Sequence, residues 1–468
     1  MSKNRSSGKP SSFSGERLNA LQDLGAAFGI QTSEPAEEEK KDTLYISFPT
    51  PYNFIPFPSV VLRRYGSPEE IPGHDRLEAD LLSGEIEISV HTKTPLVFHN
   101  PDGTPDFPKN SQGKYFLPGS SLRGLIRENM QILAYGAARA DRDIESQCCT
   151  YRVPASGRKK EKTQEVPYAH VVTDGLPEAH RQEVLDYPDS ILGFAGEKSA
   201  FRSRVSFGDL VAQGNVEQQS AIQLTLMGPK PKFCAGYIRG NEDTITDYNK
   251  DGFSLNGFKQ YWLKETVWIP EPEPVSKNNK KKPSDNKDVV SVSSPLPAGT
   301  ELRSTIRYRN LHPDELGLLL GCLDLGLWRI HPEKECFQSL GSGKPFGFGR
   351  VSIRVCSLRE YDIGSLYQSF SVQRQPDASR ERLEELMEAY ILRASELLNQ
   401  ADPENRANQK LRADQNRKRL WRERRIHDFF FMKQKVWEDP KPVSYMGLHD
   451  FEKVNTPLTT VEKLRNPK

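Results

Sequence analysis

Gly341-Ser342-Gly343-Lys344-Pro345-Phe346-Gly347-Phe348-Gly349-Arg350 is the stretch of sequence from which the fold can be read most directly. Four glycines within nine positions predict a backbone that turns sharply and exposes its amide groups, which suits close approach by a phosphate or a sugar. The apolar residues from Leu316 to Leu327 predict a helix upstream, and the alternation from Val351 to Val355 predicts a strand downstream. In both well-known nucleotide-binding motifs the glycine loop follows a strand and precedes a helix, whereas here it follows a predicted helix and precedes a predicted strand. The Walker motif also needs serine or threonine at the position that Pro345 occupies here. The loop therefore predicts a ligand other than a mononucleotide.

A second segment predicts the abrupt start of a helix after the strand-like stretch Glu85–Thr94. It reads Tyr115-Phe116-Leu117-Pro118-Gly119-Ser120-Ser121-Leu122-Arg123-Gly124-Leu125-Ile126-Arg127. Ser120 or Ser121 is predicted to cap the free amides of the first turn. Arg123 and Arg127 stand one turn apart, on a different face from an apolar stripe made of Leu122, Leu125, Ile126, Ile132 and Leu133. A helix N-terminus with two guanidinium groups close by indicates a site for a phosphodiester backbone.

These two segments resemble the RAMP proteins of CRISPR-associated effector complexes. The Pro118–Gly124 segment is similar to the first-helix signature of that family, and the glycine loop is similar to the loop ahead of its final strand. Three further stretches match in the expected order: Ile191–Gly196 with Arg204–Asp209, Asn310–Gly317, and Pro51–Pro56 with Tyr445–Leu464. The last pair resembles a larger subgroup with a Pro-Tyr-Asn-Phe motif near the N-terminus.

Two strand-rich regions with intervening helices, followed by the helix-loop-strand ending, favour a ferredoxin-like βαββαβ core. The resemblance implies the same α+β, RRM-like fold with inserted thumb or loop segments and a C-terminal helical extension. We divide the chain into a disordered polar tail (1–42), a core (43–357) and a basic helical extension (358–468). Insertions of low apolar content are expected within the core at 155–167 and 270–292.

The resemblance implies an RNA-binding subunit of a type III CRISPR effector complex, which holds the guide RNA (crRNA) by its backbone for antiviral RNA targeting. The residues that it assigns to RNA contact are Ser120, Ser121, Arg123, Arg127, Gly343, Lys344, Gly347, Gly349 and Arg350. A simple helix cap and a tight turn remain the competing interpretations for the serines and the glycines. The implied partners are guide RNA, target RNA and other effector subunits, including a polymerase-like large subunit.

An alternative hypothesis is that the subunit itself cleaves target RNA, as a metal-dependent endoribonuclease. Some members of the family cleave target RNA with an aspartate in the loop before the first helix, and Asp106 and Asp102 are the candidates here, in that order. Mg²⁺ would then be required, although no tightly bound cofactor and no fixed metal site is expected. A guide-processing endoribonuclease that uses a histidine is a further hypothesis, and a single-stranded RNA-binding module outside CRISPR is another.

Composition limits these hypotheses without choosing among them. The 468 residues carry a net charge of only +2, so RNA binding must rest on local clusters of cations. One such cluster is the arginine-rich face of the predicted strand around Arg303 and Arg307, which is either a solvated edge or an RNA-facing sheet. Six cysteines without zinc spacing predict reduced thiols. No segment has the pattern of a secretory signal or a membrane span, so we expect a cytoplasmic protein without membrane contact.

Overall fold

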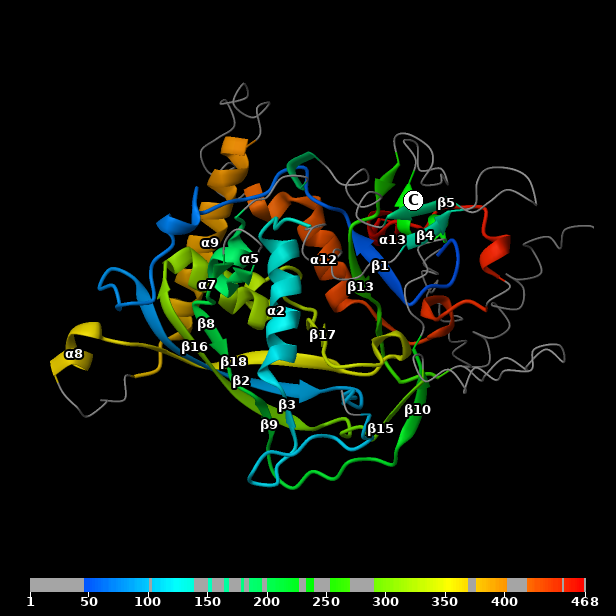
Figure 1. The fold of residues 1–468 in the computed structure, drawn as a ribbon, viewed down its shortest axis with the longest axis horizontal. Helices are drawn as coiled ribbons and strands as arrows, with labels where there is room; N and C mark the ends of the chain where they lie inside the picture. The colour runs from blue at the N-terminus through cyan, green and yellow to red at the C-terminus, as the bar shows by residue number, and fades with distance from the viewer. Residues whose placement is uncertain are drawn as a thin grey trace, which may run out of the picture. The chain divides into compact units, whose positions relative to one another are not determined.

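An antiparallel sheet of seven strands, ordered β17-β18-β2-β16-β9-β3 with β8 also paired to β16, forms the centre of the fold (Figure 1). This is a computed structural model. The residues that it describes lie in one compact unit, Tyr45–Lys468. They are residues 46–100, 103–138, 150–153, 164–167, 178–180, 185–195, 200–226, 233–239, 253–269, 290–368, 376–401, 419–447 and 450–466.

Three long strands form the middle of the sheet: β2 (Leu82–Thr92), β16 (Glu301–Leu311) and β18 (Arg350–Glu360). Their alternating apolar residues point to one face, where Ile86 opposes Ile306 and Val90 opposes Leu302 across the β2–β16 pair. The strands predicted at Glu85 and Val351 are therefore confirmed.

Shorter strands extend this sheet and build small two-stranded units beside it. Those in the central sheet are β3 (Phe116–Leu117), β8 (Val205–Phe207), β9 (Leu210–Ala212) and β17 (Gln338–Ser339). The pairs outside it are β1 (Tyr52–Ile55) with β13 (Phe258–Tyr261), β10 (Ile222–Thr225) with β15 (Val290–Ser293), β11 (Ile238–Arg239) with β12 (Ser254–Leu255), β14 (Leu263–Lys264) with β19 (Val436–Trp437), β4 (Thr150–Val153) with β5 (Gln164–Pro167), and β6 (Phe194–Ala195) with β7 (Ala200–Phe201).

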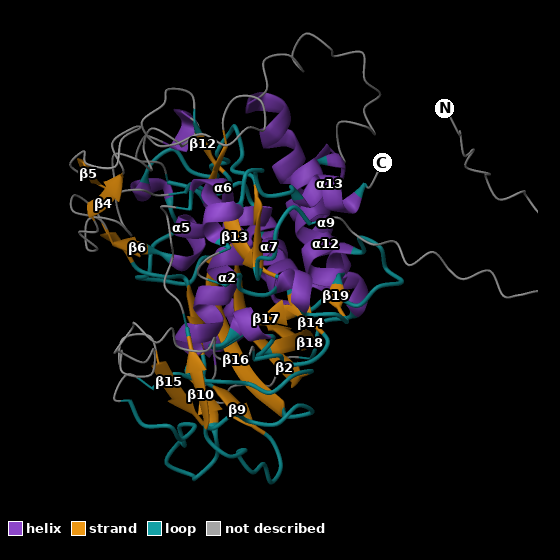
Figure 2. Ribbon diagram, turned by 90° about the vertical axis from the view of Figure 1, so that its right-hand side faces the viewer, coloured by secondary structure: helices purple, strands orange, loops and turns teal. Residues whose placement is uncertain are grey.

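Helices gather on one side of the central sheet, as Figure 2 shows. The α-helices are α2 (Gly119–Leu133), α5 (Tyr187–Leu192), α6 (Cys234–Tyr237), α7 (Pro313–Leu323), α8 (Ile363–Gln368), α9 (Arg380–Ala401), α12 (Arg424–Gln434) and α13 (Val461–Arg465). Single 3₁₀ turns are η1 (Pro68–Glu70), η2 (Glu178–His180), η4 (Leu325–Trp328), η5 (Lys344–Phe346), η6 (Arg419–Arg422), η7 (Lys441–Val443) and η8 (Phe451–Lys453). Helices α2 and α7 pack on each other and on the sheet, α9 packs against α7, and α12 contacts α2. The apolar stripes of these helices thus share one core with the sheet.

The α2 helix confirms the predicted apolar stripe but not the predicted serine cap. All five stripe residues are buried. The helix begins at Gly119, two residues earlier than a cap at Ser120 would allow, with Pro118 as its N-cap residue. The Gly119 amide donates instead to Asp209 Oδ1 at 2.9 Å, and a Cβ at Gly119 would lie 2.3 Å from the Phe207 carbonyl oxygen. Close packing against β8, with Asp209 as a distant acceptor, therefore replaces the local cap.

Replacing Gly124 with alanine should stabilise the protein by about 1 kcal/mol, because an exposed glycine inside a helix carries an entropy cost that alanine lacks. Gly124 is exposed in α2, and no atom lies within 4 Å of a Cβ built there. Urea denaturation followed by circular dichroism measures the change. Gly119→Ala is the matched control in the same helix and should be destabilising; equal effects at the two positions would contradict this account of the helix.

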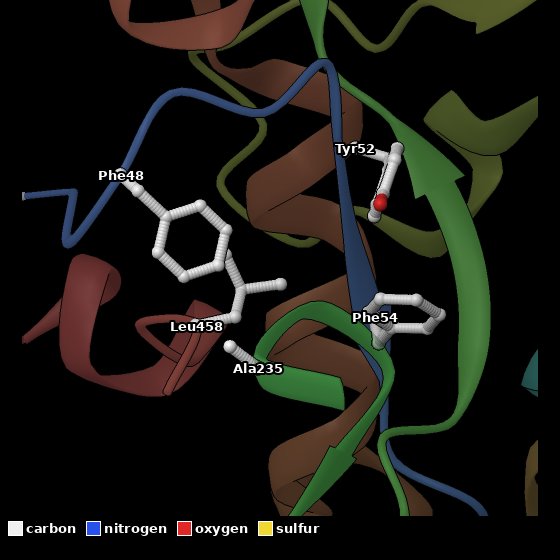
Figure 3. Packing of buried hydrophobic residues seen from close by; sticks show 5 residues of the cluster. All are labelled: Phe48, Tyr52, Phe54, Ala235 and Leu458. Atoms are coloured by element: carbon white, nitrogen blue, oxygen red, sulfur yellow. The ribbon is translucent and has the colours of Figure 1, made fainter. Parts of the chain in front are cut away.

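The segments near the two ends of the chain pack together, although 406 positions separate Asn53 from Thr459. Thr50 N–H donates to the Pro442 carbonyl oxygen at 3.3 Å, and Asn53 Nδ2 donates to the Thr459 carbonyl oxygen at 2.9 Å. Side chains from both ends then share a buried cluster: Phe48, Tyr52, Phe54, Ala235 and Leu458 (Figure 3). The Pro-Tyr-Asn-Phe segment and the C-terminal segment are therefore parts of one structural unit.

Several sequence predictions fall on residues outside those described. They are the tail 1–42, most of the insertions 155–167 and 270–292, and the basic segment 402–418. The helix predicted after Asp377 is confirmed as α9, whose buried side chains include Leu386, Tyr390 and Leu398. None of the helices within the described ranges has the length and apolar character that a membrane crossing requires.

Candidate nucleic-acid interface

The glycine loop turns as its sequence predicts. Gly341, Gly343, Gly347 and Gly349 all have positive φ, between 71° and 95°. At Gly349 a Cβ would lie 1.8 Å from the Leu340 carbonyl oxygen, and at Gly341 it would lie 2.4 Å from the Val97 carbonyl oxygen. Only glycine satisfies both the backbone conformation and this close packing.

The amides of the loop are less exposed than predicted. Ser342 N–H donates to the Val97 carbonyl oxygen, Gly347 N–H to that of Lys344, and Gly349 N–H to that of Pro95. Gly343, Gly347 and Gly349 are themselves buried. The prediction of amides open to a ligand is therefore wrong for Gly347 and Gly349, because the turn satisfies its own donors within the fold. Lys344 and Arg350, which are half-buried, are the charged side chains of the loop.

Two phenylalanines anchor the loop. Phe346 and Phe348 are each 4% exposed and pack with Val97 and Leu224. The Phe346 ring also meets Tyr445, with ring centroids 5.8 Å apart. This apolar anchor holds the loop at the end of the sheet where β18 begins beside the last residues of β2.

Four cations from distant parts of the chain surround the loop: Lys264, Lys344, Arg350 and Lys433, here called the loop cations. Lys264 Nζ donates to the Pro345 carbonyl oxygen at 2.6 Å, and Lys433 Nζ donates to Gln260 Oε1 at 2.7 Å. The Arg350 guanidinium lies 5.1 Å from the Phe337 ring centroid. Within the described residues, none of the four forms an ion pair with a carboxylate.

Two of the loop cations, Lys264 and Lys433, are buried, and within the described residues neither forms an ion pair with a carboxylate. Burial lowers the pKa of Lys264 to about 8. Burial also lowers the pKa of Lys433 to about 8, a shift that Glu128 opposes and the Lys344 charge reinforces. A buried cation without an anionic partner is costly, and an arriving phosphate would relieve that cost. Lys344 and Arg350 were predicted from the sequence, whereas Lys264 and Lys433 were not, since single lysines 169 positions apart carry no local signal.

The arginines of α2 have partners within the fold. Arg123 Nη2 donates to the Leu192 carbonyl oxygen at 2.6 Å. Arg127 donates to the Gly193 carbonyl oxygen at 3.2 Å and pairs with Asp189 at 2.5 Å. The two guanidiniums thus hold the C-terminal end of α5, and their contact with RNA stays a prediction. Of the two serines, Ser120 is exposed and Ser121 is half-buried.

The strand β13 links the helix α2 to one of the loop cations. Gln260 Nε2 donates to Glu128 Oε1 at 2.6 Å, and Gln260 Oε1 accepts from Lys433. In the described part of the chain, no hydrogen bond or ion pair joins Arg123 or Arg127 to the glycine loop. The structure therefore brings Glu128, not the two arginines, toward the loop cations.

The predicted catalytic aspartates are untested by the structure. Asp102 lies outside the described residues. Asp106 is exposed, and its Oδ1 accepts from Gln218 Nε2 at 2.6 Å. No group of three or more His, Cys, Asp or Glu side chains in the described ranges is placed to hold a metal ion. A catalytic role for either aspartate stays a prediction.

The arginine-rich face of β16 exists as predicted, but its charges are compensated. Arg303 pairs with Glu301 and Arg307 pairs with Glu85, each at 2.8 Å. In β18, Arg359 pairs with Glu87 at 2.9 Å. Because carboxylates match these guanidiniums, the positive field of this face is weaker than that of the loop cations.

The part of the chain that contains α2 and the glycine loop is similar to a known protein family. Residues 89–352 match the model of the RAMP superfamily. The match begins within β2 and ends within β18, so it includes both α2 and the glycine loop. No curated protein matches the chain. Since the matched region covers more than half of the 468 residues, this chain belongs to the RAMP superfamily.

Proposed function

We propose that this protein is the subunit of a type III CRISPR effector complex that holds the guide RNA by its sugar-phosphate backbone. Membership of the RAMP superfamily points to a CRISPR-associated RNA-binding subunit. The observation that carries the finer proposal is the cluster of loop cations, which have no carboxylate partner within the described residues. Positive charge gathered without compensation favours a polyanion.

The strand order supports a ferredoxin-like interpretation of the core. Along the chain, β2 is followed by α2, then β8 and β9, β16, α7 and β18. In the sheet, β18 lies beside β2, β2 beside β16, and β16 beside β8 and β9. A βαββαβ unit whose first and third strands are neighbours has this arrangement. The glycine loop then occupies the connection into the last strand of the unit.

Backbone binding suits a guide whose sequence must vary. Lys344 and Arg350 of the loop would contact phosphate oxygens, and the Arg350 guanidinium is already oriented by the Phe337 ring. Lys264 and Lys433, which are buried behind the loop, would add to the positive field without direct contact. None of these groups reads a base edge, so the affinity should depend on salt and not on RNA sequence.

The double variant Lys344→Glu with Arg350→Glu should lose the RNA that the protein retains when it is expressed with its neighbouring effector subunits. The substitution reverses two charges beside the loop while leaving its glycines intact. The RNA that co-purifies should fall at least tenfold, and the salt slope of binding should flatten by about 0.7 for each phosphate that the variant no longer neutralises. Gel analysis of the purified complex and titration with a labelled single strand measure the two effects.

A charge-matched control keeps this test specific. Arg303→Glu with Arg307→Glu makes the same change of charge on the compensated face of β16. This control should retain most of the RNA. Equal retention by both double variants, with both complexes folded, would contradict the assignment of the interface to the glycine loop.

A further inference from the structure

Two of the loop cations, Lys264 and Lys433, lie in the interior of the protein, where they are 1% and 5% exposed. Lysine is almost never buried to this degree unless a carboxylate pairs with it. Within the described residues, neither ammonium has such a partner. Lys264 Nζ donates to the carbonyl oxygen of Pro345, and Lys433 Nζ donates to the side-chain amide oxygen of Gln260. The acceptors of both charges are therefore neutral oxygens.

Both lysines belong to the surroundings against which the glycine loop packs. A Cβ at Gly347 would lie 3.1 Å from Lys264 Cβ, so the loop backbone rests against this side chain. The charge of Lys344 lowers the pKa of Lys433. Lys344 and Lys433 therefore lie close enough to repel each other, and an anion at the loop relieves this repulsion.

Glu128 of α2 compensates the charge of Lys433 only in part. Its Oε1 accepts from Gln260 Nε2 at 2.6 Å, and Gln260 Oε1 accepts from Lys433 Nζ at 2.7 Å, so a neutral amide separates the carboxylate from the ammonium. Glu128 raises the pKa of Lys433, but burial lowers it by more. For Lys264, burial is the cause of the lowered pKa. The folded protein therefore holds two charges whose loss of hydration is incompletely compensated.

This unfavourable term belongs to the folded state. In the unfolded chain water solvates each ammonium, so the two charges lower the free energy of unfolding. A polyanion at the glycine loop interacts with the folded protein and offsets the term there. Because coupled equilibria affect each other equally, the charge that weakens the free protein is also the charge that strengthens its complex with RNA.

We propose that Lys264 and Lys433 make the stability of the folded protein depend on the RNA bound at the glycine loop, so that the subunit becomes fully stable only when it is loaded. This inference rests on the proposed function and adds its regulation, since an unloaded subunit unfolds more readily than a loaded one. A lysine that served the fold alone, through its hydrogen bond, would have the opposite signature, because its loss would weaken the free protein.

Lys433→Met, which removes the charge and keeps an apolar side chain, tests the proposal in the full chain. Without RNA, its midpoint of denaturation should shift to a higher concentration of urea, a denaturant that adds no screening ions. In a titration with a single-stranded oligoadenylate, its affinity should fall about fivefold or more, within the usual range of coupling between sites. Lys264→Met should have both effects as well. Lys433→Arg keeps the charge and should keep the affinity.

Arg425→Met is the matched control. Arg425 is a buried cation of the same helix, α12, and none of its guanidinium nitrogens has a hydrogen-bond partner in the described part of the chain. It lies over the Tyr135 ring, with its Cζ 4.5 Å from the ring centroid, and about 12 Å of helix separate it from Lys433. The control should leave the RNA affinity unchanged. An equal fall in affinity in Arg425→Met and Lys433→Met would mean that net charge, and not the charge behind the loop, sets the binding.

The pH dependence gives a second readout. The titratable groups that act on Lys433 are Glu128, Lys344 and Cys336; burial lowers the pKa of Lys433 from its ordinary 10.5 to about 8 and raises the pKa of Cys336 to about 11. Between about pH 7 and about pH 9 the unfolded chain therefore binds more protons than the folded one, and the urea midpoint of the free protein should rise with pH. Over the same range the RNA affinity should fall, because Lys433 loses its charge. In Lys433→Met both trends should be weaker.

The outcomes separate this inference from the proposed function. A higher urea midpoint together with weaker RNA binding in the two methionine variants supports it. A lower midpoint in both variants, or an unchanged RNA affinity in both, overturns it. If Lys344→Glu with Arg350→Glu loses its RNA in spite of that result, the proposed function stands and the inference alone fails. If that double variant keeps its RNA, the interface itself is misassigned.

Discussion

Replacing Glu315 with alanine should destabilise the protein by about 3–5 kcal/mol, because it leaves a buried guanidinium without its counter-ion. The side chains of Arg204 and Glu315 are fully buried and form an ion pair between Arg204 Nη2 and Glu315 Oε1. A second bond joins Arg204 Nη1 to Glu315 Oε2 at 2.9 Å. Glu315 also accepts from Tyr65 Oη at 3.2 Å and from the His312 amide at 3.0 Å. One substitution thus removes the acceptor of five donors, which come from Arg204, Tyr65, Ser190 and His312, at the junction of α5, β8 and α7.

The midpoint of guanidinium chloride denaturation measures this loss. The control is the double variant Arg204→Met with Glu315→Leu, which removes both charges and should recover a large part of the stability. Glu315→Ala with an unchanged midpoint, or a double variant that is less stable than the single one, would show that the pair does not hold this junction together.

Replacing Gly349 with alanine should cost about 2–5 kcal/mol, the sum of a left-handed backbone penalty and a steric displacement. Gly349 has a φ of 71°, and a Cβ there would lie 1.8 Å from the Leu340 carbonyl oxygen. The Leu340 amide also donates to the Gly349 carbonyl oxygen at 2.8 Å, so the two segments cannot separate without losing this bond. The same change should reduce RNA retention, because it displaces Arg350.

Gly214→Ala is the matched control for this prediction. Gly214 has nearly the same φ, 69°, but no atom lies within 4 Å of a Cβ built there. It should cost only the backbone penalty of about 1–2 kcal/mol. Thermal unfolding of the two variants compares the costs directly. An equal loss at both positions would mean that the close approach of Leu340 does not constrain the loop.

Much of the local structure could be predicted from the sequence. The alternation around Ile86 and Val351 predicted the central strands, and the spacing of Leu122, Leu125 and Ile126 predicted the buried face of α2. The glycines of the loop predicted its turns. Each of these features depends on the conformational preference or the periodicity of neighbouring residues, which the order of residues states directly.

The partners of the charged groups could not be predicted in the same way. Arg123 and Arg127 have the pattern of a phosphate site, yet α5 supplies carbonyl oxygens and Asp189 to satisfy them. Arg303 and Arg307 have a comparable pattern, and glutamates of β16 and β2 pair with them. The serine cap of α2 was wrong for a related reason, since Asp209 supplies the acceptor from a segment ninety positions away.

The strands, the helices, the glycine turns and the family signature that spans them all follow from the order of the residues. Which cations are left without a carboxylate depends instead on the folded chain. It gathered Lys264, Lys344, Arg350 and Lys433 around one loop, and it placed Lys259 among tyrosines from both ends of the chain. The two differ because backbone conformation depends on nearby residues, whereas the compensation of a charge depends on the groups that the fold brings within a few ångströms of it.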